Sequence, residues 1–194
     1  MNNTVGSQQD NIICGMLLGD SFLERNGKFV RLVTDHSLKQ KEYLEWKARQ
    51  INLLSTPIVL KKRSDTRTGK IYSHCVLRTY TNPALEKYVS LFYQGNRKII
   101  PKQLSLIINP QMLAIWIMDD GYKRNDCNAL RLNTQGYTLN EQKIIKEALK
   151  TIGLKANIQK HKEHFVIYIP SDSMQHLRNL VGKFIAPTME YKIA

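Results

Sequence analysis

The chain has 194 residues, enough to fold as one globular unit or as two small ones that share a core. Its formal net charge of +13, from 29 Lys and Arg against 16 Asp and Glu, favours a polyanionic partner, with nucleic acid ahead of a membrane surface. No apolar run approaches the roughly 20 residues that span a bilayer, which argues against a membrane protein. The first residues do not form a signal peptide, so we expect an intracellular protein. Cys14, Cys75 and Cys127 contain no Cys-x-x-Cys pair, which argues against a disulfide framework and a structural zinc site.

The first half of the chain carries the signals of a helix, two strands, a helix, two strands and a final helix. Residues 11–18 are an apolar helical segment, and Asn26-Gly27 between residues 22–23 and 29–33 is a strong hairpin signal. Residues 38–54 have apolar side chains at helical spacing. A second hairpin is predicted within residues 58–80, with its turn near Thr68-Gly69, and Pro83 suits the first turn of a helix that runs to about Tyr93.

The second half repeats this order. Its predicted helices cover residues 113–119, 139–152 and 174–184, and its predicted strands lie around 128–134 and at 155–159 and 165–169. At an offset of about 100 residues, 13–20 aligns with 113–120, Arg31 with Arg131, and 51–54 with 151–154, and at a slightly shorter offset 97–99 aligns with 191–193. We therefore predict an α+β fold built from a duplicated αββαββα unit, with half-domains at residues 11–100 and 101–194.

Each apolar segment of the repeat ends in an acid, Asp20 in the first half and Asp120 in the second. A carboxylate at a helix C-terminus is unfavourable by roughly 0.3–1 kcal/mol unless something compensates it. If the two helices pack side by side about a pseudo-two-fold axis, the two carboxylates meet and repel each other unless they are protonated or bridged by a cation. A hard dication such as Mg²⁺ removes this repulsion and supports phosphodiester hydrolysis. A single Asp would be read as a solvated helix end, but the matched pair predicts a metal site.

Residues 13–21 (ICGMLLGDS) and 113–121 (LAIWIMDDG) resemble two copies of the motif of the LAGLIDADG homing endonucleases. The segments 97–101, 133–135 and 190–193 extend the resemblance over nearly the whole chain from Asn11 onward. The resemblance implies a monomeric single-chain enzyme with a pseudo-two-fold, saddle-shaped fold. It also implies double-strand cleavage of a long DNA target with Mg²⁺ or Mn²⁺, across the minor groove with short 3′ overhangs, by a protein encoded in a mobile intron.

By this resemblance, the catalytic residues are the two acids together with Lys98 and Lys192, which match each other in the repeat. A lysine beside the scissile phosphate would stabilise developing charge or order the attacking water. Gln135 follows a predicted strand and is expected to hold water near the metals, although its counterpart Asp35 differs in charge.

The expected metal-binding set also includes Gly19 and Asp119, which directly precede the two acids. Gly15 and Gly19 are spaced i, i+4, which lets a neighbouring helix approach closely. The second copy departs from this pattern, since Ile115 and Asp119 stand at the aligned positions. Because the second copy lacks these glycines, the helix contact is expected to be asymmetric. Asp119 is a rival metal ligand, but the family pattern gives that role to the last acid, Asp120.

Strand alternation puts Arg131, Asn133 and Gln135 on one face, with Arg31 at the equivalent place in the first half. Two such sheets would present a basic saddle to the major groove, where Arg and Asn can read base edges. We expect about half of the candidate contact residues to touch DNA, mostly at phosphates. The candidates are Arg31, Lys61, Lys62, Arg63, Arg67, Lys70, Arg78, Lys123, Arg131, Asn133, Lys160 and Lys162.

Two other functions are considered. A non-catalytic RNA maturase on the same scaffold would help its host intron RNA to fold, but it would need the basic surface without the acids and lysines. A basic structural nucleic-acid protein would leave the paired motifs unexplained. Richness in Ile, Asn and Lys is typical of an AT-rich genome, so we expect an intracellular protein of a mitochondrion, a chloroplast or the bacterial cytoplasm. The five histidines show no metal-ligand spacing and receive no role.

Overall fold

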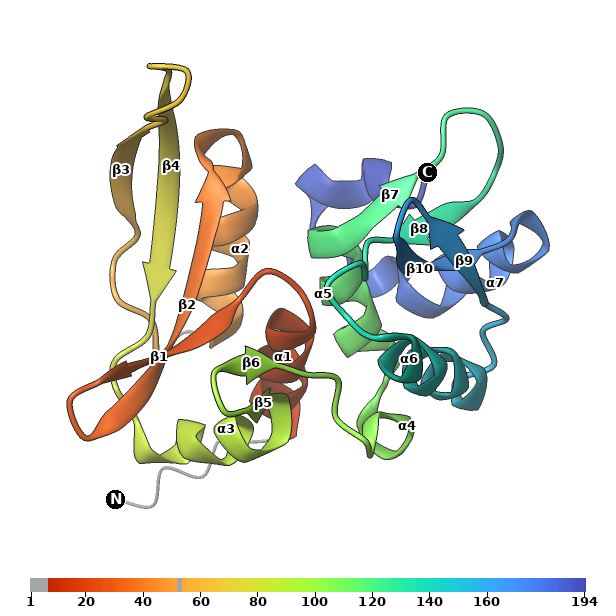
Figure 1. Ribbon diagram of the computed structural model, residues 1–194, viewed down its shortest axis with the longest axis horizontal. Coiled ribbons are helices and arrows are strands. Elements are labelled where there is room, and N and C mark those ends of the chain that lie inside the picture. The colour runs from red at the N-terminus through yellow and green to blue at the C-terminus, as the bar shows by residue number, and fades with distance from the viewer. Residues whose placement is uncertain (1–6, 52–53) are drawn as a thin grey trace.

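The computed structural model describes residues 7–51 and 54–194, which form two similar halves side by side (Figure 1). In the first half, an antiparallel sheet of order β1-β2-β4-β3 accompanies three helices. The elements are α1 (Ser7–Leu18), β1 (Phe22–Asn26), β2 (Phe29–Ser37), α2 (Lys41–Ile51), β3 (Val59–Ser64), β4 (Ile71–Arg78) and α3 (Glu86–Phe92).

The second half has the same element order, and its sheet has the equivalent strand order β7-β8-β10-β9. The elements are α5 (Pro110–Asp120), β7 (Gly121–Lys123), β8 (Leu130–Leu132), α6 (Leu139–Thr151), β9 (Asn157–His161), β10 (His164–Ile169) and α7 (Ser171–Val181). The predicted duplicated αββαββα fold is therefore confirmed.

Helices α1 and α5 pack against each other between the two sheets (Figure 1). A Cβ atom at Gly15 would lie 3.0 Å from Ile115 Cβ and 3.0 Å from the Met112 carbonyl oxygen. At Gly19 the space is already filled, since a Cβ there would lie 2.3 Å from Asp119 Oδ2. Over residues 12–18 of α1 and 112–118 of α5 the helices are buried on all sides, so these stretches are apolar and lack an amphipathic stripe. The glycines of the first motif allow the close approach, and it is asymmetric, as expected.

The hairpins follow their turn signals. Asn26 pairs with Phe29, and Gly27 between them has a φ of 69°. In the second hairpin Gly69 has a φ of 67°. A positive φ costs glycine little, so these positions turn the chain without strain. The β9–β10 turn instead places Lys162 at a φ of 54°, a conformation that side-chain-bearing residues rarely adopt.

Several predicted boundaries were wrong by a few residues. The helix predicted at 38–54 begins with a 3-10 turn (Leu38–Gln40) before α2, and residues 52 and 53 lie outside the described residues. The helix predicted to run to about Tyr93 does end there, at Phe92, because Tyr93 pairs with Lys98. The strand predicted at 155–159 begins at Asn157, after buried Leu154 and Ala156 have brought the chain from α6 to the sheet. Helix α7 begins directly after Pro170, and residues 182–184 continue it only as a 3-10 turn.

Several short elements were not predicted. They are β5 (Tyr93–Gln94), β6 (Arg97–Lys98), α4 (Leu104–Ile107) and a 3-10 segment at Pro187–Lys192, in addition to β7. Two of them, β6 and the last 3-10 segment, carry the matched lysines. All three cysteines are free thiols, with only Cys127 exposed. Among the described residues, none of the helices has the length and apolar character that a bilayer crossing requires.

Candidate active site

The two motif acids stand at adjacent helix ends. Asp20 follows α1, and Asp120 is the last residue of α5. The backbone N–H of Asp20 donates to Asp119 Oδ2 at 3.1 Å, so the two motifs are joined by a direct hydrogen bond. The Asp20 side chain remains 41% exposed and is open to a ligand.

Negative charge is concentrated at this place. Burial raises the pKa of Asp120 to about 7, and the charges of Asp20 and Asp119 contribute further. Burial, followed by the charge of Asp119, also raises the pKa of Asp20. The indole N–H of Trp116 donates to Asp120 Oδ2 at 3.1 Å and partly offsets the shift. Carboxylates that resist ionisation side by side are ones that a dication would stabilise. The donor set therefore fits a hard divalent ion.

The two matched lysines reach the same site by equivalent contacts. Lys98 Nζ donates to the carbonyl oxygens of Gly19 at 2.6 Å and Ser21 at 2.9 Å. Lys192 Nζ donates to the carbonyl oxygens of Gly121 at 2.7 Å and Asp119 at 3.5 Å. Burial lowers the pKa of Lys98 to about 8 and lowers that of Lys192 as well. Each half thus holds one ammonium at the end of its motif helix, as the repeat predicted.

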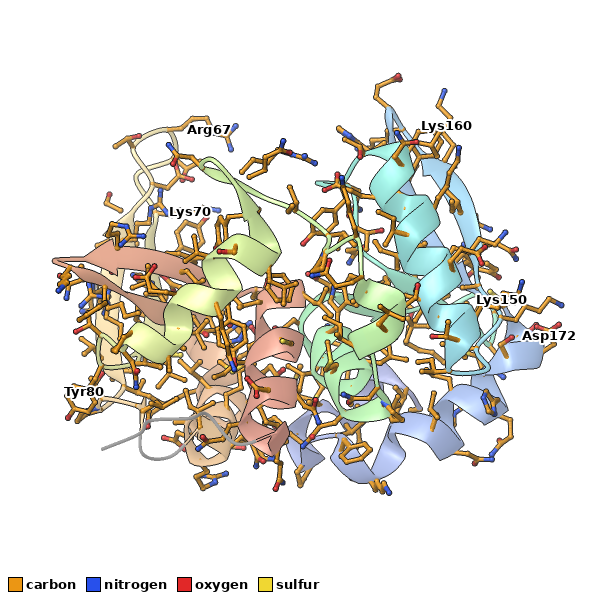
Figure 2. The ribbon with its side chains drawn as sticks, turned by 90° about the horizontal axis from the view of Figure 1, so that it is seen from below. Arg67, Lys70, Tyr80, Lys150, Lys160 and Asp172 are labelled. Carbon is orange, nitrogen blue, oxygen red and sulfur yellow. The ribbon has the colours of Figure 1, made fainter. Side chains whose placement is uncertain are left out.

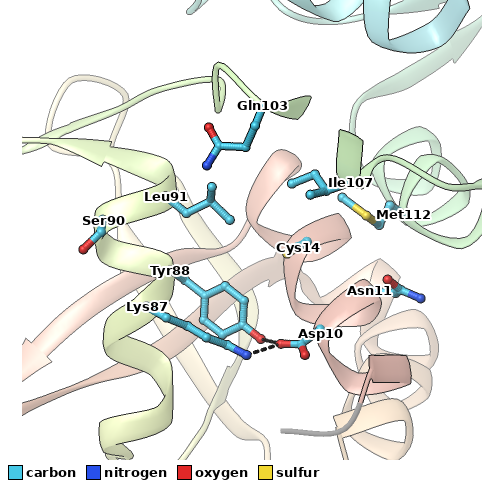
Figure 3. Close-up of a pocket in the computed structure, with 10 residues that line it drawn as sticks. All are labelled: Asp10, Asn11, Cys14, Lys87, Tyr88, Ser90, Leu91, Gln103, Ile107 and Met112. Carbon is cyan, nitrogen blue, oxygen red and sulfur yellow. Dashed lines mark hydrogen bonds and ion pairs between the residues drawn. The ribbon is translucent and has the colours of Figure 1, made fainter. Parts of the chain in front are cut away.

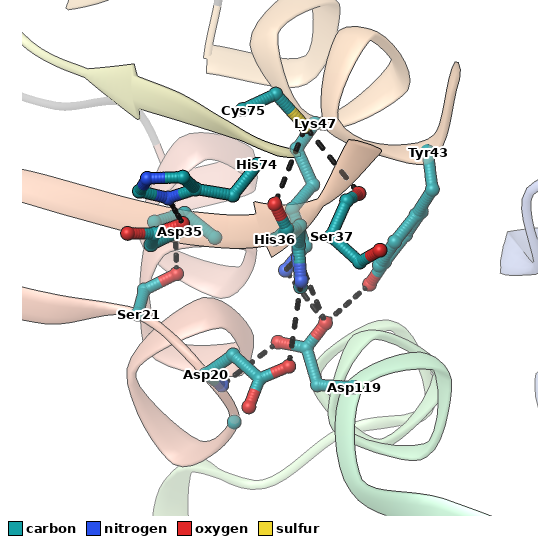
Figure 4. A network of polar contacts seen from close by, with 12 residues as sticks. Asp20, Ser21, Asp35, His36, Ser37, Tyr43, Lys47, His74, Cys75 and Asp119 are labelled. Carbon is teal, nitrogen blue, oxygen red and sulfur yellow. Dashed lines mark hydrogen bonds and ion pairs between the residues drawn. The ribbon is translucent and has the colours of Figure 1, made fainter. Parts of the chain in front are cut away.

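A buried polar network lies behind the acids (Figure 4). Asp119 Oδ1 accepts from Lys47 Nζ at 2.6 Å and from the Tyr43 hydroxyl at 2.8 Å. Lys47 Nζ also lies 3.1 Å from His36 Nε2, and His36 Nδ1 faces Asp20 Oδ2 at 3.6 Å. Burial and the charge of Lys47 lower the pKa of His36 to about 4, so this imidazole is neutral at pH 7.

This network was not predicted from the sequence, because the histidines show no metal-ligand spacing and Lys47 was not among the candidate residues. One signal was available. Lys47 lies on the apolar stripe of α2, in helical register with Tyr43, Leu44 and Ile51, all of which are buried. A lysine on a buried stripe must find a counter-charge.

Of the four residues expected to bind metal, Asp20 and Asp120 offer carboxylates at the open end of the site. Gly19 has no side-chain ligand and its carbonyl accepts from Lys98, whereas the Asp119 carboxylate is engaged by three donors. Gln135 lies after β8, and its amide donates to Asn133 Oδ1 at 3.5 Å. Its counterpart Asp35 lies 2.6 Å from His74 Nδ1, so the two positions differ in partner as well as in charge.

Strand register divides the candidate DNA-binding residues between two faces. Residues paired across neighbouring strands lie on the same face of a sheet. In the first sheet Val33 pairs with Arg78 and Lys61 pairs with His74. Because His74 and Arg78 are four residues apart on β4, both pairs lie on one face. Arg31, Lys61, Arg63 and Arg78 lie on this face, turned away from buried Leu32 and Leu77. In the second sheet the corresponding face carries Tyr122, Arg131, Tyr168 and Asn157.

Other candidates lie elsewhere. Lys62, Lys123 and Lys160 pair with Ser73, Leu130 and Phe165, which places them on the opposite faces from Lys61 and Arg131. Arg67, Lys70 and Lys162 belong to hairpin turns, and Figure 2 shows Arg67 and Lys160 along the same edge of the molecule. Asn133 is exposed, as the alternation predicted. Arg31 is paired with Glu24 at 2.6 Å, whereas the buried Arg131 Nε has no partner among the described residues.

A separate cavity of about 530 Å³ lies between α1, α3 and the N-terminal end of α5 (Figure 3). Asp10 accepts a hydrogen bond from Tyr88 and forms an ion pair with Lys87 at 2.6 Å at its edge. Burial raises the pKa of the Cys14 thiol in its wall to about 12, so this thiol is not a nucleophile. No predicted site residue lines this cavity.

Comparison with known proteins agrees with the geometry. The model of the LAGLIDADG DNA endonuclease family matches residues 10–177. The cytochrome b mRNA maturase bI2 of Saccharomyces cerevisiae is 32% identical over all of this chain, which spans 49% of that relative. The DNA endonuclease I-ChuI of Chlamydomonas applanata is 28% identical, with 96% of this chain and 94% of the relative covered. The solved structure of the homing endonuclease I-WcaI bound to its DNA recognition sequence matches with a TM-score of 0.91 and 28% identity, covering 99% of this chain and 88% of that chain.

Proposed function

Because the chain belongs to the LAGLIDADG DNA endonuclease family, we propose that it is a site-specific homing endonuclease that cuts both strands of a long DNA target. The observation that carries the proposal is the pair of carboxylates, Asp20 and Asp120, each accompanied by its own lysine. Related proteins named as DNA or intron-encoded endonucleases support it. A monomer is expected to suffice, since both motifs are present in one chain.

Asp20 and Asp120 are the side chains that would hold Mg²⁺ or Mn²⁺ against the scissile phosphates, with Gly19 and Asp119 beside them. When bound, such an ion supplies an activated water and neutralises a phosphate. Lys98 and Lys192 hold an ammonium at each helix end, where it can stabilise negative charge on the pentacovalent phosphate. Gln135 is proposed to order water beside the site.

DNA would lie across the sheet faces that carry Arg31, Lys61, Arg63 and Arg78 in the first half and Arg131 in the second. The unpartnered N–H of Arg131 supports this placement, because a buried donor is costly until an acceptor satisfies it. Arg67, Lys70 and Lys162 at the hairpin turns are suited to phosphate contacts. Lys62, Lys123 and Lys160 would reach DNA only around the edge of a sheet.

The test replaces each acid by its amide. Asp20→Asn and Asp120→Asn should bind a selected target in Ca²⁺ about as tightly as the unaltered protein, because shape is kept. Both should lose double-strand cleavage in Mg²⁺, because the charge that holds the ion is gone. Asp172→Asn, at an exposed ion pair with Lys155, is the matched control and should cut normally. Normal cutting by either active-site variant would contradict the mechanism.

A second function is favoured by two relatives named as cytochrome b mRNA maturases. In that case the chain would bind its host intron RNA and promote splicing. Tight binding of a structured intron RNA, with no cleavage of any DNA selected from a randomised library in Mg²⁺, would replace the nuclease proposal. For either function the richness in Ile, Asn and Lys, which is typical of an AT-rich genome, supports an organellar or bacterial host.

A further inference from the structure

Three side chains behind the motif helices are arranged like the ligands of a metal ion. Asp20, His36 and Asp119 each offer one atom, and these atoms lie within 4.8 Å of one another. Two carboxylates and an imidazole at such spacing suit a divalent ion such as Zn²⁺. This cluster differs from the pair Asp20 and Asp120, because it draws on His36 of β2 and on Asp119, the penultimate residue of α5.

A cation already stands in the cluster. The Lys47 side chain is fully buried, and its ammonium lies 2.6 Å from Asp119 Oδ1 and 3.1 Å from His36 Nε2. It also lies 4.6 Å from the centroid of the Tyr43 ring. Because the Lys47 ammonium has only donors, His36 Nε2 accepts from it and the ring hydrogen is on Nδ1, toward Asp20.

The ammonium orients Asp119. With Oδ1 held by Lys47 and Tyr43, Oδ2 is left to accept the backbone N–H of Asp20. The carboxylate occupies the space that Gly19 leaves by lacking a side chain. The chain Lys47, Asp119, Asp20 therefore runs from α2 of the first half, through the second motif, to the first catalytic acid. Gly19, the equivalent of Asp119 in the first motif, has no side chain that could make the reverse connection.

We propose that Lys47 is a positioning residue of the cleavage site: its ammonium acts as a built-in cation that fixes Asp119 against Asp20 and keeps divalent metal out of the Asp20–His36–Asp119 cluster. Divalent metal is thereby confined to the outer acids, Asp20 and Asp120. The proposal rests on the proposed function for its kinetic consequence, whereas its metal-binding consequence can be measured on the free protein.

The first experiment follows the His36 ring signals by NMR during titration with Zn²⁺, with His36→Gln used for assignment. In the unaltered protein and in the control Lys41→Met, an exposed lysine of the same helix, Zn²⁺ at the outer acids leaves both ring nitrogens without a metal bond, so the ring ¹⁵N shifts should change only slightly. In Lys47→Met they should change strongly as Zn²⁺ replaces the ammonium. In Lys47→Met/Asp119→Asn, which removes both buried charges, this strong change should be lost.

Folding failure does not obscure this result. If Lys47→Met folds only with Zn²⁺ present, the replacement of one cation by another is supported. A variant that stays unfolded in Zn²⁺, a folded variant whose ring ¹⁵N shifts change no more than those of the unaltered protein, or ligation of His36 by Zn²⁺ in the unaltered protein would each overturn the metal-exclusion proposal.

The second experiment measures strand cutting at saturating DNA, with affinity determined in Ca²⁺. Lys47→Met should cut about ten-fold more slowly while its affinity changes by less than about two-fold, because the defect lies in placing the catalytic acid. The double variant should recover most of the rate. Unchanged cutting by Lys47→Met would overturn the positioning role. An inactive unaltered protein would instead contradict the proposed function and leave the NMR result standing.

Discussion

At the motif ends, burial and the charges of Asp20 and Asp119 alter the ionisation of the Asp120 carboxyl. Its ordinary pKa of 3.8 rises to about 7 because it is buried and faces Asp20 and Asp119. An acid whose pKa is raised in the folded protein opposes folding only where it is ionised. The cost is absent below about pH 4, grows as pH rises, and is complete above about pH 7.

Asp120→Asn should therefore stabilise the metal-free protein in a pH-dependent way. In EDTA the free energy of unfolding of the variant should match that of the unaltered protein near pH 4 and exceed it near pH 7.5 by on the order of 4 kcal/mol, which corresponds to the rise of the pKa from 3.8 to about 7. Mg²⁺ should reduce the difference by stabilising the carboxylate of the unaltered protein. Urea unfolding across this pH range provides the measurement, and a difference independent of pH would contradict the assignment.

Residue by residue, the sequence was informative where the repeat could be used. The acids, Asp20 and Asp120, and the lysines, Lys98 and Lys192, were found because each has a counterpart. Lys47 was not matched by the repeat, and its one signal, its place on the apolar stripe of α2, does not identify its partner. Its burial depends on Asp119, 72 residues away, and such a contact is a property of the folded chain.

At the level of the elements, the close contact of α1 with α5 depends on two glycines of the first motif, Gly15 and Gly19. A Cβ at Gly19 would lie 2.6 Å from the Asp119 Cβ and 2.3 Å from its Oδ2. Because Asp119 is held by Lys47 and Tyr43, it cannot move aside without losing buried hydrogen bonds.

Gly19→Ala should accordingly destabilise the protein by roughly 1–3 kcal/mol, the usual cost of overpacking a core. The control is Gly136→Ala, where a Cβ would meet nothing within 4 Å. That variant should change the free energy of unfolding by less than about 0.5 kcal/mol. Thermal or urea unfolding compares the two, and equal stability would mean that the helix contact tolerates a methyl group.

Elements with local signals were predictable, and those formed by distant pairing were not. The hairpins were recognised from Asn26-Gly27 and Thr68-Gly69, because turn geometry is set by a few adjacent residues. Strands β5 and β6 contain two residues each, too few for a periodic pattern. The bounds of the second sheet were displaced for the same reason, since β7 and β8 contain three residues each.

Over the whole molecule, a formal charge of +13 predicts strongly salt-dependent DNA binding. Strand register predicts different contributions of the neighbours Lys61 and Lys62 to this salt dependence, because Lys61 shares a face with Arg31 and Arg78 whereas Lys62 lies on the other face. Lys61→Ala should lower the slope of log K against log salt by about 0.9. Lys62→Ala, which the sequence alone grouped with it, should leave the slope nearly unchanged.

Fluorescence anisotropy with a selected target at several salt concentrations gives both slopes. Equal losses for the two variants would show that the β3–β4 hairpin is wrapped by DNA on both faces. An affinity independent of salt would point away from a nucleic-acid partner.

The two sheets differ in the lengths of their strands. In the first half β2 and β4 have nine and eight residues, whereas the equivalent β8 and β10 have three and six. A homodimer presents identical surfaces and is matched to a palindrome, since its two-fold axis imposes the same reading on each half-site. One chain with unlike halves is free of that constraint. The preferred target is therefore expected to be non-palindromic, with the half-site under the longer β1–β4 sheet making contacts over more base pairs than the other.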